Sequence, residues 1–266
     1  MLSMKGILHK LIILVLTTAF TMSACTGNAQ KNNAAQISIQ KKLEKLSDWR
    51  YDEEPEFNVD SFAKVLNREM LAYLSKRPFQ VADSKMKLER ITTSDSLLTI
   101  YNYSYSSGGT AGNLYTAIVQ WKKPDGKYGA ALLDVYDHFY ESHILSRSKE
   151  HNLYLFIGTS KGSSQVACAD ALVLELSGDR LNLNYPAFYN QYPALSYNDD
   201  IYTPEIPAAI AEIVYNAEKR RLIIKDLGSA DEVGPKHKNN SELQNVIKGR
   251  NSLSYTFDGK RFTENP

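Results

Sequence analysis

The sequence predicts an α+β protein, built mainly of antiparallel β-sheet with a short helical portion near its N-terminus. Apolar residues follow a helical period before Pro78 and a strand-like alternation after it. Beyond Pro78, pairs of strand-like runs are separated by short turns rich in Gly, Asn and Asp, which is typical of hairpins. The length of 266 residues, with 43% hydrophobic and 23% charged residues, fits a globular chain with a sizeable core.

The charge balance bears on the class of partner. The chain carries 31 Lys and Arg residues against 30 Asp and Glu residues, a formal net charge of +1. A balanced charge gives no electrostatic reason to expect a nucleic-acid partner. The composition also excludes a disordered chain and a polytopic membrane protein.

The first 24 residues have the pattern of an export signal. Lys5 and Lys10 precede an apolar run of 14 residues that ends at Ala24. A helix needs roughly 20 apolar residues to span a bilayer, so the run is short for a membrane anchor. A basic start, a short apolar run and small residues at its end are typical of a signal peptide. An uncleaved anchor is the alternative.

Residues 22–25 read Met-Ser-Ala-Cys and end this run. Here the sequence resembles bacterial lipoprotein precursors, in which an apolar residue and two small residues precede a cysteine. The resemblance implies that Cys25 carries acyl chains such as palmitate, becomes the first mature residue and anchors the protein on a membrane. Residues 26–28 read Thr-Gly-Asn, without the acidic residue that often retains such proteins in the inner membrane. This favours the outer membrane of a Gram-negative bacterium.

We expect three parts along the chain. Residues 1–24 are the signal peptide, polar residues 25–36 form a flexible tether, and residues 37–266 form a single globular β-rich domain. The chain has 2 cysteines, Cys25 and Cys168. With Cys25 lipidated, the domain folds without a disulfide, and the apolar neighbours of Cys168 predict a buried thiol.

Two helices are expected before Pro78. Apolar residues recur at helical spacing over residues 37–47 and, more strongly, over residues 60–76. Asp60 or Ser61 can cap the second helix at its start, and Pro78 ends it. The apolar stripe of the second helix predicts a packing face.

The remainder is expected to form successive hairpins. Turn residues such as Lys-Pro-Asp-Gly at 123–126 separate the strand-like runs. The glycine-rich residues 106–112 lack the spacing of a phosphate-binding loop and are expected to be a wide hairpin loop. No residue-level repeat typical of a propeller is found. Strands are expected at 97–105, 114–121, 129–136, 153–157, 172–176, 181–183, 210–215, 221–225, 253–257 and 261–262.

Residues 185–207 contain five tyrosines and four prolines. Proline excludes a central strand or a helix interior, so the aromatic rings either pack onto the domain or form a contact surface. Tyrosine suits recognition because it is amphipathic and loses little entropy on contact. Tyr189, Tyr192 and Tyr197 are the candidate ligand-binding residues, for a glycan, a peptide or an envelope protein.

Residues 158–162 read Gly-Thr-Ser-Lys-Gly, a G-x-S-x-G pattern after a strand-like run. Here the sequence resembles the nucleophile elbow of α/β-hydrolases. The resemblance implies Ser160 as nucleophile, a helix over residues 163–174 and His237 as base. However, residues 166–176 lead straight into a hairpin turn, and the chain lacks alternating strand and helix units. The acid candidates are Asp199, Asp200 and Asp226.

A group of carboxylates and imidazoles follows the strand expected at 129–136. Its spacing matches neither H-E-x-x-H nor an EF-hand loop, so we interpret the group as solvated turn residues and expect no metal site and no cofactor. Its members are Asp134, Asp137, His138, Glu141 and His143.

The favoured function is a non-catalytic binding or accessory module of the cell envelope, attached to a membrane through Cys25. The alternative is a serine hydrolase that uses Ser160. A helix after Ser160 would support the enzyme, and a strand there would support the module.

Overall fold

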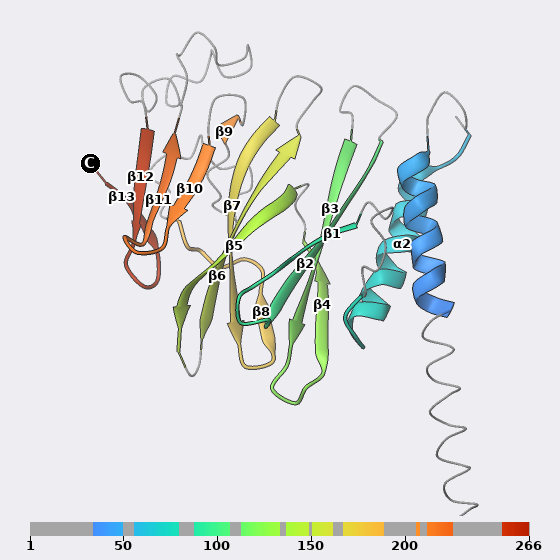
Figure 1. Cartoon of the computed structure of the whole chain (residues 1–266), viewed down its shortest axis with the longest axis horizontal. Coiled ribbons are helices and arrows are strands. Elements are labelled where there is room, and N and C mark those ends of the chain that lie inside the picture. The colour runs from blue at the N-terminus through green and yellow to red at the C-terminus, as the bar shows by residue number, and fades with distance from the viewer. Residues whose placement is uncertain are drawn as a thin grey trace, which may run out of the picture. The chain divides into compact units, whose positions relative to one another are not determined.

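The chain is α+β, as the sequence predicts. In the described part of this computed structural model, two helices come first and antiparallel strands in three sheets follow (Figure 1). Residues from Leu43 onward form one compact unit, and the contacts below lie within it. The structure describes residues 34–49, 56–79, 88–106, 113–133, 137–148, 151–161, 167–188, 206–207, 212–225 and 252–265.

The first helix covers residues 34–48 and so begins earlier than the predicted 37–47. Ala34, Ala35 and Gln36 have high helix propensity, which explains the earlier start within the expected tether.

The second helix, α2 (Val59–Leu74), has a different cap from the one predicted. The Asn58 side chain accepts a hydrogen bond from the Ser61 backbone N–H at 2.9 Å. Asn58 is therefore the N-cap in place of Asp60 or Ser61, because its carboxamide oxygen satisfies a backbone donor of the first turn.

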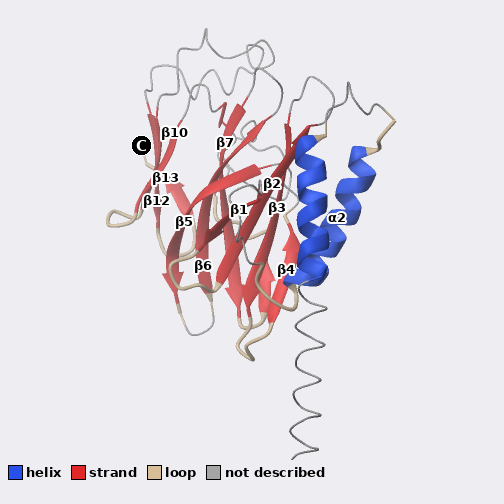
Figure 2. Cartoon of the chain, turned by 45° about the vertical axis from the view of Figure 1, so that its right-hand side comes forward, coloured by secondary structure: helices blue, strands red, loops and turns tan. Residues whose placement is uncertain are grey.

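Helix α2 packs against the outer face of the first sheet (Figure 2). The Gln120 side chain on the sheet donates to the backbone oxygens of Leu74 at 2.5 Å and Arg77 at 2.9 Å. These bonds satisfy carbonyl groups at the end of the helix and fix its position on the sheet. The buried stripe of α2 consists of Val59, Ala63, Leu66, Met70, Tyr73 and Leu74.

Apart from β9, strands that follow one another in the chain are paired within each sheet, so each sheet is an antiparallel meander. Sheet A contains β1 (Leu88–Thr92), β2 (Leu98–Ser106), β3 (Asn113–Lys122) and β4 (Tyr128–Leu132). Sheet B contains β5 (Asp137–Arg147), β6 (Asn152–Lys161), β7 (Ala167–Ser177) and β8 (Arg180–Asn182), with β9 (Ile206–Pro207) beside β7. Sheet C contains β10 (Glu212–Asn216), β11 (Arg221–Lys225), β12 (Ser252–Phe257) and β13 (Phe262–Glu264).

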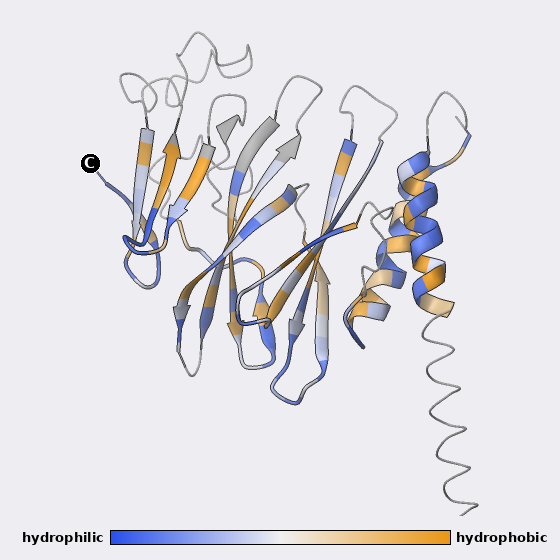
Figure 3. Ribbon diagram, viewed as in Figure 1, coloured by the Kyte–Doolittle hydropathy of each residue, from blue (hydrophilic) through white to orange (hydrophobic). Residues whose placement is uncertain are grey.

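Sheet B is the middle layer of a stack of three sheets. Along β6, Leu155 and Ile157 belong to the core shared with sheet C, whereas Tyr154 and Phe156 belong to the core shared with sheet A. Side chains on a strand alternate between its two faces, so both faces of β6 are buried. This explains the continuous apolar run along β6, in contrast to the polar turns that join the strands (Figure 3).

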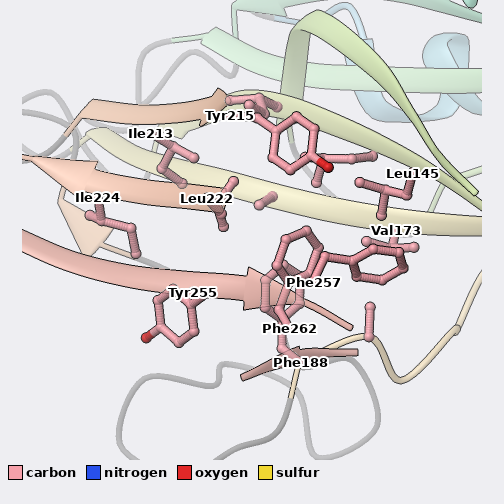
Figure 4. Close-up of a cluster of buried hydrophobic side chains, with 14 of the residues drawn as sticks. Leu145, Val173, Phe188, Ile213, Tyr215, Leu222, Ile224, Tyr255, Phe257 and Phe262 are labelled. Carbon is pink, nitrogen blue, oxygen red and sulfur yellow. The ribbon is translucent and has the colours of Figure 1, made fainter. Parts of the chain in front are cut away.

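Aromatic rings fill the core between sheets B and C (Figure 4). The rings of Phe188 and Phe262 are stacked, with centroids 4.9 Å apart and planes inclined by 10°. Phe257 lies 5.0 Å and Tyr215 lies 6.2 Å from the Phe262 ring. Three segments distant in sequence therefore meet at Phe262: residue 188, strand β10 and the β12–β13 hairpin.

The predicted hairpins are confirmed around the turns at 123–126, 177–180, 216–219 and 258–260. One interpretation was wrong: Asp137, His138, Glu141 and His143 are not turn residues but belong to β5. Two register shifts in β5 interrupt the alternation of polar and apolar residues, so the sequence does not read as a strand.

Candidate functional site

Strand β5 carries a group of polar side chains near the surface, including two acid–imidazole pairs. It is an edge strand of sheet B, and β1 and β10 are edge strands of sheets A and C. The pairing of β5 with β6 omits Tyr140, because Phe139 faces Gly158 and Glu141 faces Ile157. Tyr140 is thus the extra residue of a β-bulge, and bulges re-aim side chains at sheet edges and functional sites.

An acid–imidazole pair links β5 to sheet A. His138 Nε2 lies 2.8 Å from Glu89 Oε2 on β1, and the His138 ring lies 5.6 Å from the Tyr115 ring on β3. The His138 side chain is 26% exposed and the Glu89 side chain 71%. The histidine is held on two sides, while its carboxylate partner faces solvent.

Beside this pair, Asn102 fixes the backbone of β5. Its side chain donates to the Phe139 carbonyl at 2.8 Å and accepts from the Phe139 N–H at 3.3 Å. Gly158 allows the close approach: a Cβ there would lie 2.9 Å from the His138 carbonyl oxygen. The position of His138 therefore depends on the polar side chain of Asn102 and on the absence of a side chain at Gly158.

A second acid–imidazole pair lies on the other side of Tyr140. His143 Nε2 lies 2.6 Å from Glu141 Oε1, and the His143 ring lies 4.9 Å from the Tyr215 ring of β10. Burial raises the pKa of the Tyr215 phenol, and the nearby Arg220 guanidinium partly offsets this. At the second bulge, the Arg220 side chain donates to the Leu145 carbonyl at 3.4 Å.

We call this region the first-strand edge: Glu89, His138, Tyr140, Glu141, His143 and Tyr215, contributed by β1, β5 and β10. It contains two carboxylates, each within hydrogen-bonding distance of an imidazole, and an exposed tyrosine. Such groups accept hydrogen bonds and attract cations, which suits binding.

Asp170 is the one charged side chain among the described residues that is buried, at 3% exposure. It lies on β7 opposite Gly158 of β6, and Gly158 in turn is opposite Phe139 of β5. Burial of a carboxylate is costly without polar partners, so this position marks a polar end of the core between sheets A and B.

Ser160 lies in β6 and not at a strand-to-helix turn. Strand β7 follows and pairs antiparallel with β6, with Ser160 opposite Cys168. A nucleophile elbow needs a helix over residues 163–174, whereas residues 167–174 are extended. Residues 167–176 instead form the strand that leads into the turn at 177–180. His237, Asp199, Asp200 and Asp226 lie outside the described residues.

No group of three or more His, Cys, Asp or Glu side chains placed to hold a metal ion occurs within the described ranges. In the candidate set, His138 is paired with Glu89 and His143 with Glu141. Asp134 lies outside the described residues.

The candidate ligand-binding residues Tyr189, Tyr192 and Tyr197 lie outside the described residues, as does the lipidation candidate Cys25. The described part of the Tyr- and Pro-rich segment packs onto the domain. Phe188 is 8% exposed within the core, and the Tyr185 hydroxyl donates to the Lys260 carbonyl at 3.0 Å.

Sequence reasoning missed Glu89 and Tyr140. Glu89 is separated from His138 by 49 positions, so only the fold brings them together. The bulge at Tyr140 interrupts the alternation of polar and apolar residues along the strand. This interruption is the signal in the sequence by which Tyr140 could have been found.

Comparison with models of known protein families, with curated proteins and with solved structures finds no match for this chain. In the described part of the chain, none of the helices is both long and apolar enough to cross a bilayer.

Proposed function

We propose that this chain is a lipid-anchored binding or accessory module of the cell envelope, at the outer membrane of a Gram-negative bacterium. The cysteine at the end of the export signal carries this proposal. Cys25 follows a short apolar run and two small residues, the arrangement of lipoprotein precursors. Each buried CH₂ of an acyl chain contributes about 0.8 kcal/mol, so several chains would hold the protein firmly on a membrane.

Acyl labelling in cells tests the anchor. Cells that express the full chain are grown with an alkynyl palmitate, and the chain is examined for label and size. We expect wild type to be labelled and to run smaller than its precursor, and Cys25→Ser to lose both label and processing. Cys168→Ser is the matched control, since these are the 2 cysteines of the chain. Labelling that persists in Cys25→Ser, or wild type that stays full length, contradicts the proposal.

We favour binding over serine hydrolysis because of the backbone around Ser160. The serine lies in β6, and strand β7 pairs with β6 in place of the helix that an elbow needs. Oriented carboxylates beside a surface tyrosine on β5 are consistent with a contact surface.

Labelling with a fluorophosphonate probe tests this choice on the purified full-length protein. We expect no labelling of wild type above the level of Ser160→Ala. Labelling of wild type that Ser160→Ala abolishes would establish the hydrolase and remove the binding proposal.

A further inference from the structure

We propose that the first-strand edge binds a basic, extended polypeptide segment, whose Lys or Arg side chains pair with Glu89 and Glu141 and cover the ring of Tyr140. The inference rests on the proposed binding function and names the chemistry of the partner.

The first argument is the exposure of Tyr140. Its side chain lies at the β5 bulge and the residue is 47% exposed, the highest value among the exposed large hydrophobic residues of the described part. The others are Ile37, Val65 and Leu132, on other elements. A bulge that turns an aromatic residue outward on an edge strand gives a partner a fixed, amphipathic contact.

The second argument is the orientation of the two glutamates. Glu89 and Glu141 side chains are 71% and 41% exposed, yet each lies within 2.8 Å of an imidazole whose own side chain is at most 26% exposed. Ordering a free surface glutamate costs side-chain entropy on binding. A carboxylate already held by a histidine loses less, and each carboxylate has a second oxygen for a ligand.

The third argument is charge. Among the described residues, Glu89 and Glu141 are paired with histidines, whereas Lys127 and Arg147 are paired with aspartates. Along β5, one of these carboxylates therefore pairs with the residue two positions before Tyr140, and the other belongs to the residue directly after it. Each carboxylate attracts a Lys or Arg side chain, and a Lys or Arg over a tyrosine ring gains a cation–π contact. A neutral glycan would gain nothing from this charge.

The fourth argument is extent. His138 and His143 mark the two pairs along β5. The five steps from His138 to His143 span about 16 Å at roughly 3.3 Å per residue, which an extended segment of similar length can cover. The pair at His138 faces sheet A and the pair at His143 faces Tyr215 of sheet C, so the segment crosses the edge of the stack.

Fluorescence anisotropy with the full-length protein in detergent tests the proposal. The probe is a labelled peptide of four Lys-Thr repeats, with a Glu-Thr peptide of equal length for comparison. We expect binding of the Lys-Thr peptide alone, weakened severalfold when ionic strength is raised to about 0.5 M. The double variant Glu89→Gln/Glu141→Gln should weaken binding about tenfold, and Tyr140→Leu should weaken it severalfold while Tyr140→Phe retains it.

Glu56→Gln/Glu218→Gln is the matched control, because it removes the same charge from two exposed residues on other elements. Absence of binding, or an equal loss in the control variant, overturns the proposal. Equal competition by a neutral chito-oligosaccharide that Tyr140→Leu abolishes overturns it in favour of a glycan. If any of these results is obtained while Cys25 is still acyl-labelled, the proposed ligand class is wrong. The proposal of a lipid-anchored module is then unaffected.

Discussion

The two cores that flank sheet B are built differently. Between sheets B and C, apolar side chains and stacked aromatic rings make the contact, centred on Phe262. Between sheets A and B, apolar side chains share the space with hydrogen-bonded polar groups. Asn102 bonds the backbone of Phe139, and the Tyr154 hydroxyl donates to Asp95 at 3.0 Å.

The difference separates two tasks that packed sheets must perform. Apolar area supplies most of the free energy of association but accepts many arrangements of comparable area. A buried hydrogen bond adds little net stability, yet it penalises arrangements in which its partners are apart. The core with sheet A therefore fixes where β5 lies, and with it His138, whereas the core with sheet C mainly supplies stability.

The largest expected effect comes from Phe262→Ala, which tests the aromatic core. Phe262 is 0% exposed and contacts the rings of Phe188, Phe257 and Tyr215. Removing its ring should lower the free energy of unfolding by about 3–5 kcal/mol, since the site loses apolar burial and keeps a cavity. Urea denaturation followed by tryptophan fluorescence measures the change.

The exposed neighbour Thr263 provides the control, because Thr263→Ala should change the free energy of unfolding by less than about 0.5 kcal/mol. A loss under about 1 kcal/mol for Phe262→Ala would show that this core can collapse around the gap, and the proposed division of tasks would fail.

The two regions also differ in how far the sequence predicts them. The hairpins of sheet C follow from local turn signals, and the confirmed turn at 258–260 joins β12 to β13. Strand β1 was not expected, because the exposed Glu89 and Arg90 interrupt its apolar pattern. The polar contacts of sheet A join residues such as Asn102 and Phe139, 37 positions apart, and no local propensity encodes such a pair.

An intermediate effect is expected for Asn102→Leu, which removes the polar anchor and keeps a similar side-chain volume. The Phe139 N–H and carbonyl would lose their partner at a buried site, at a cost of about 2–3 kcal/mol in the free energy of unfolding. We also expect the amide of Phe139 to exchange its hydrogen faster, because the bond that protects it is gone.

Asn182→Leu is the matched control for this anchor. Asn182 lies exposed on β8, where its side chain donates to Glu175 at 3.2 Å, and the same change there should have little effect. If Asn102→Leu proved as stable as wild type with unchanged exchange at Phe139, the core with sheet A would be held by apolar contact alone.

The smallest effect on the free energy of unfolding at neutral pH is expected for Tyr154→Phe. At alkaline pH, the variant and wild type should differ in how steeply this free energy falls. Burial and the nearby Asp95 carboxylate raise the pKa of the Tyr154 phenol above its usual 10.0. The neutral phenol is therefore favoured in the folded protein. Its contribution to stability is fully present below pH 10 and declines above it, where the unfolded chain loses the proton more readily.

Each such tyrosine steepens the alkaline fall in the free energy of unfolding by up to about 1.4 kcal/mol per pH unit. Tyr154→Phe should therefore cost about 1 kcal/mol at pH 7 and flatten the fall above pH 10, as measured by urea denaturation across that range. Burial also raises the pKa of Tyr101 and Tyr103 on sheet A, so part of the fall should remain in the variant. At Tyr215, on strand β10 of sheet C, Arg220 opposes the effect of burial, so Tyr215→Phe should flatten the fall less. Equal slopes for both variants and wild type would mean that the Tyr154–Asp95 contact does not distinguish the core with sheet A.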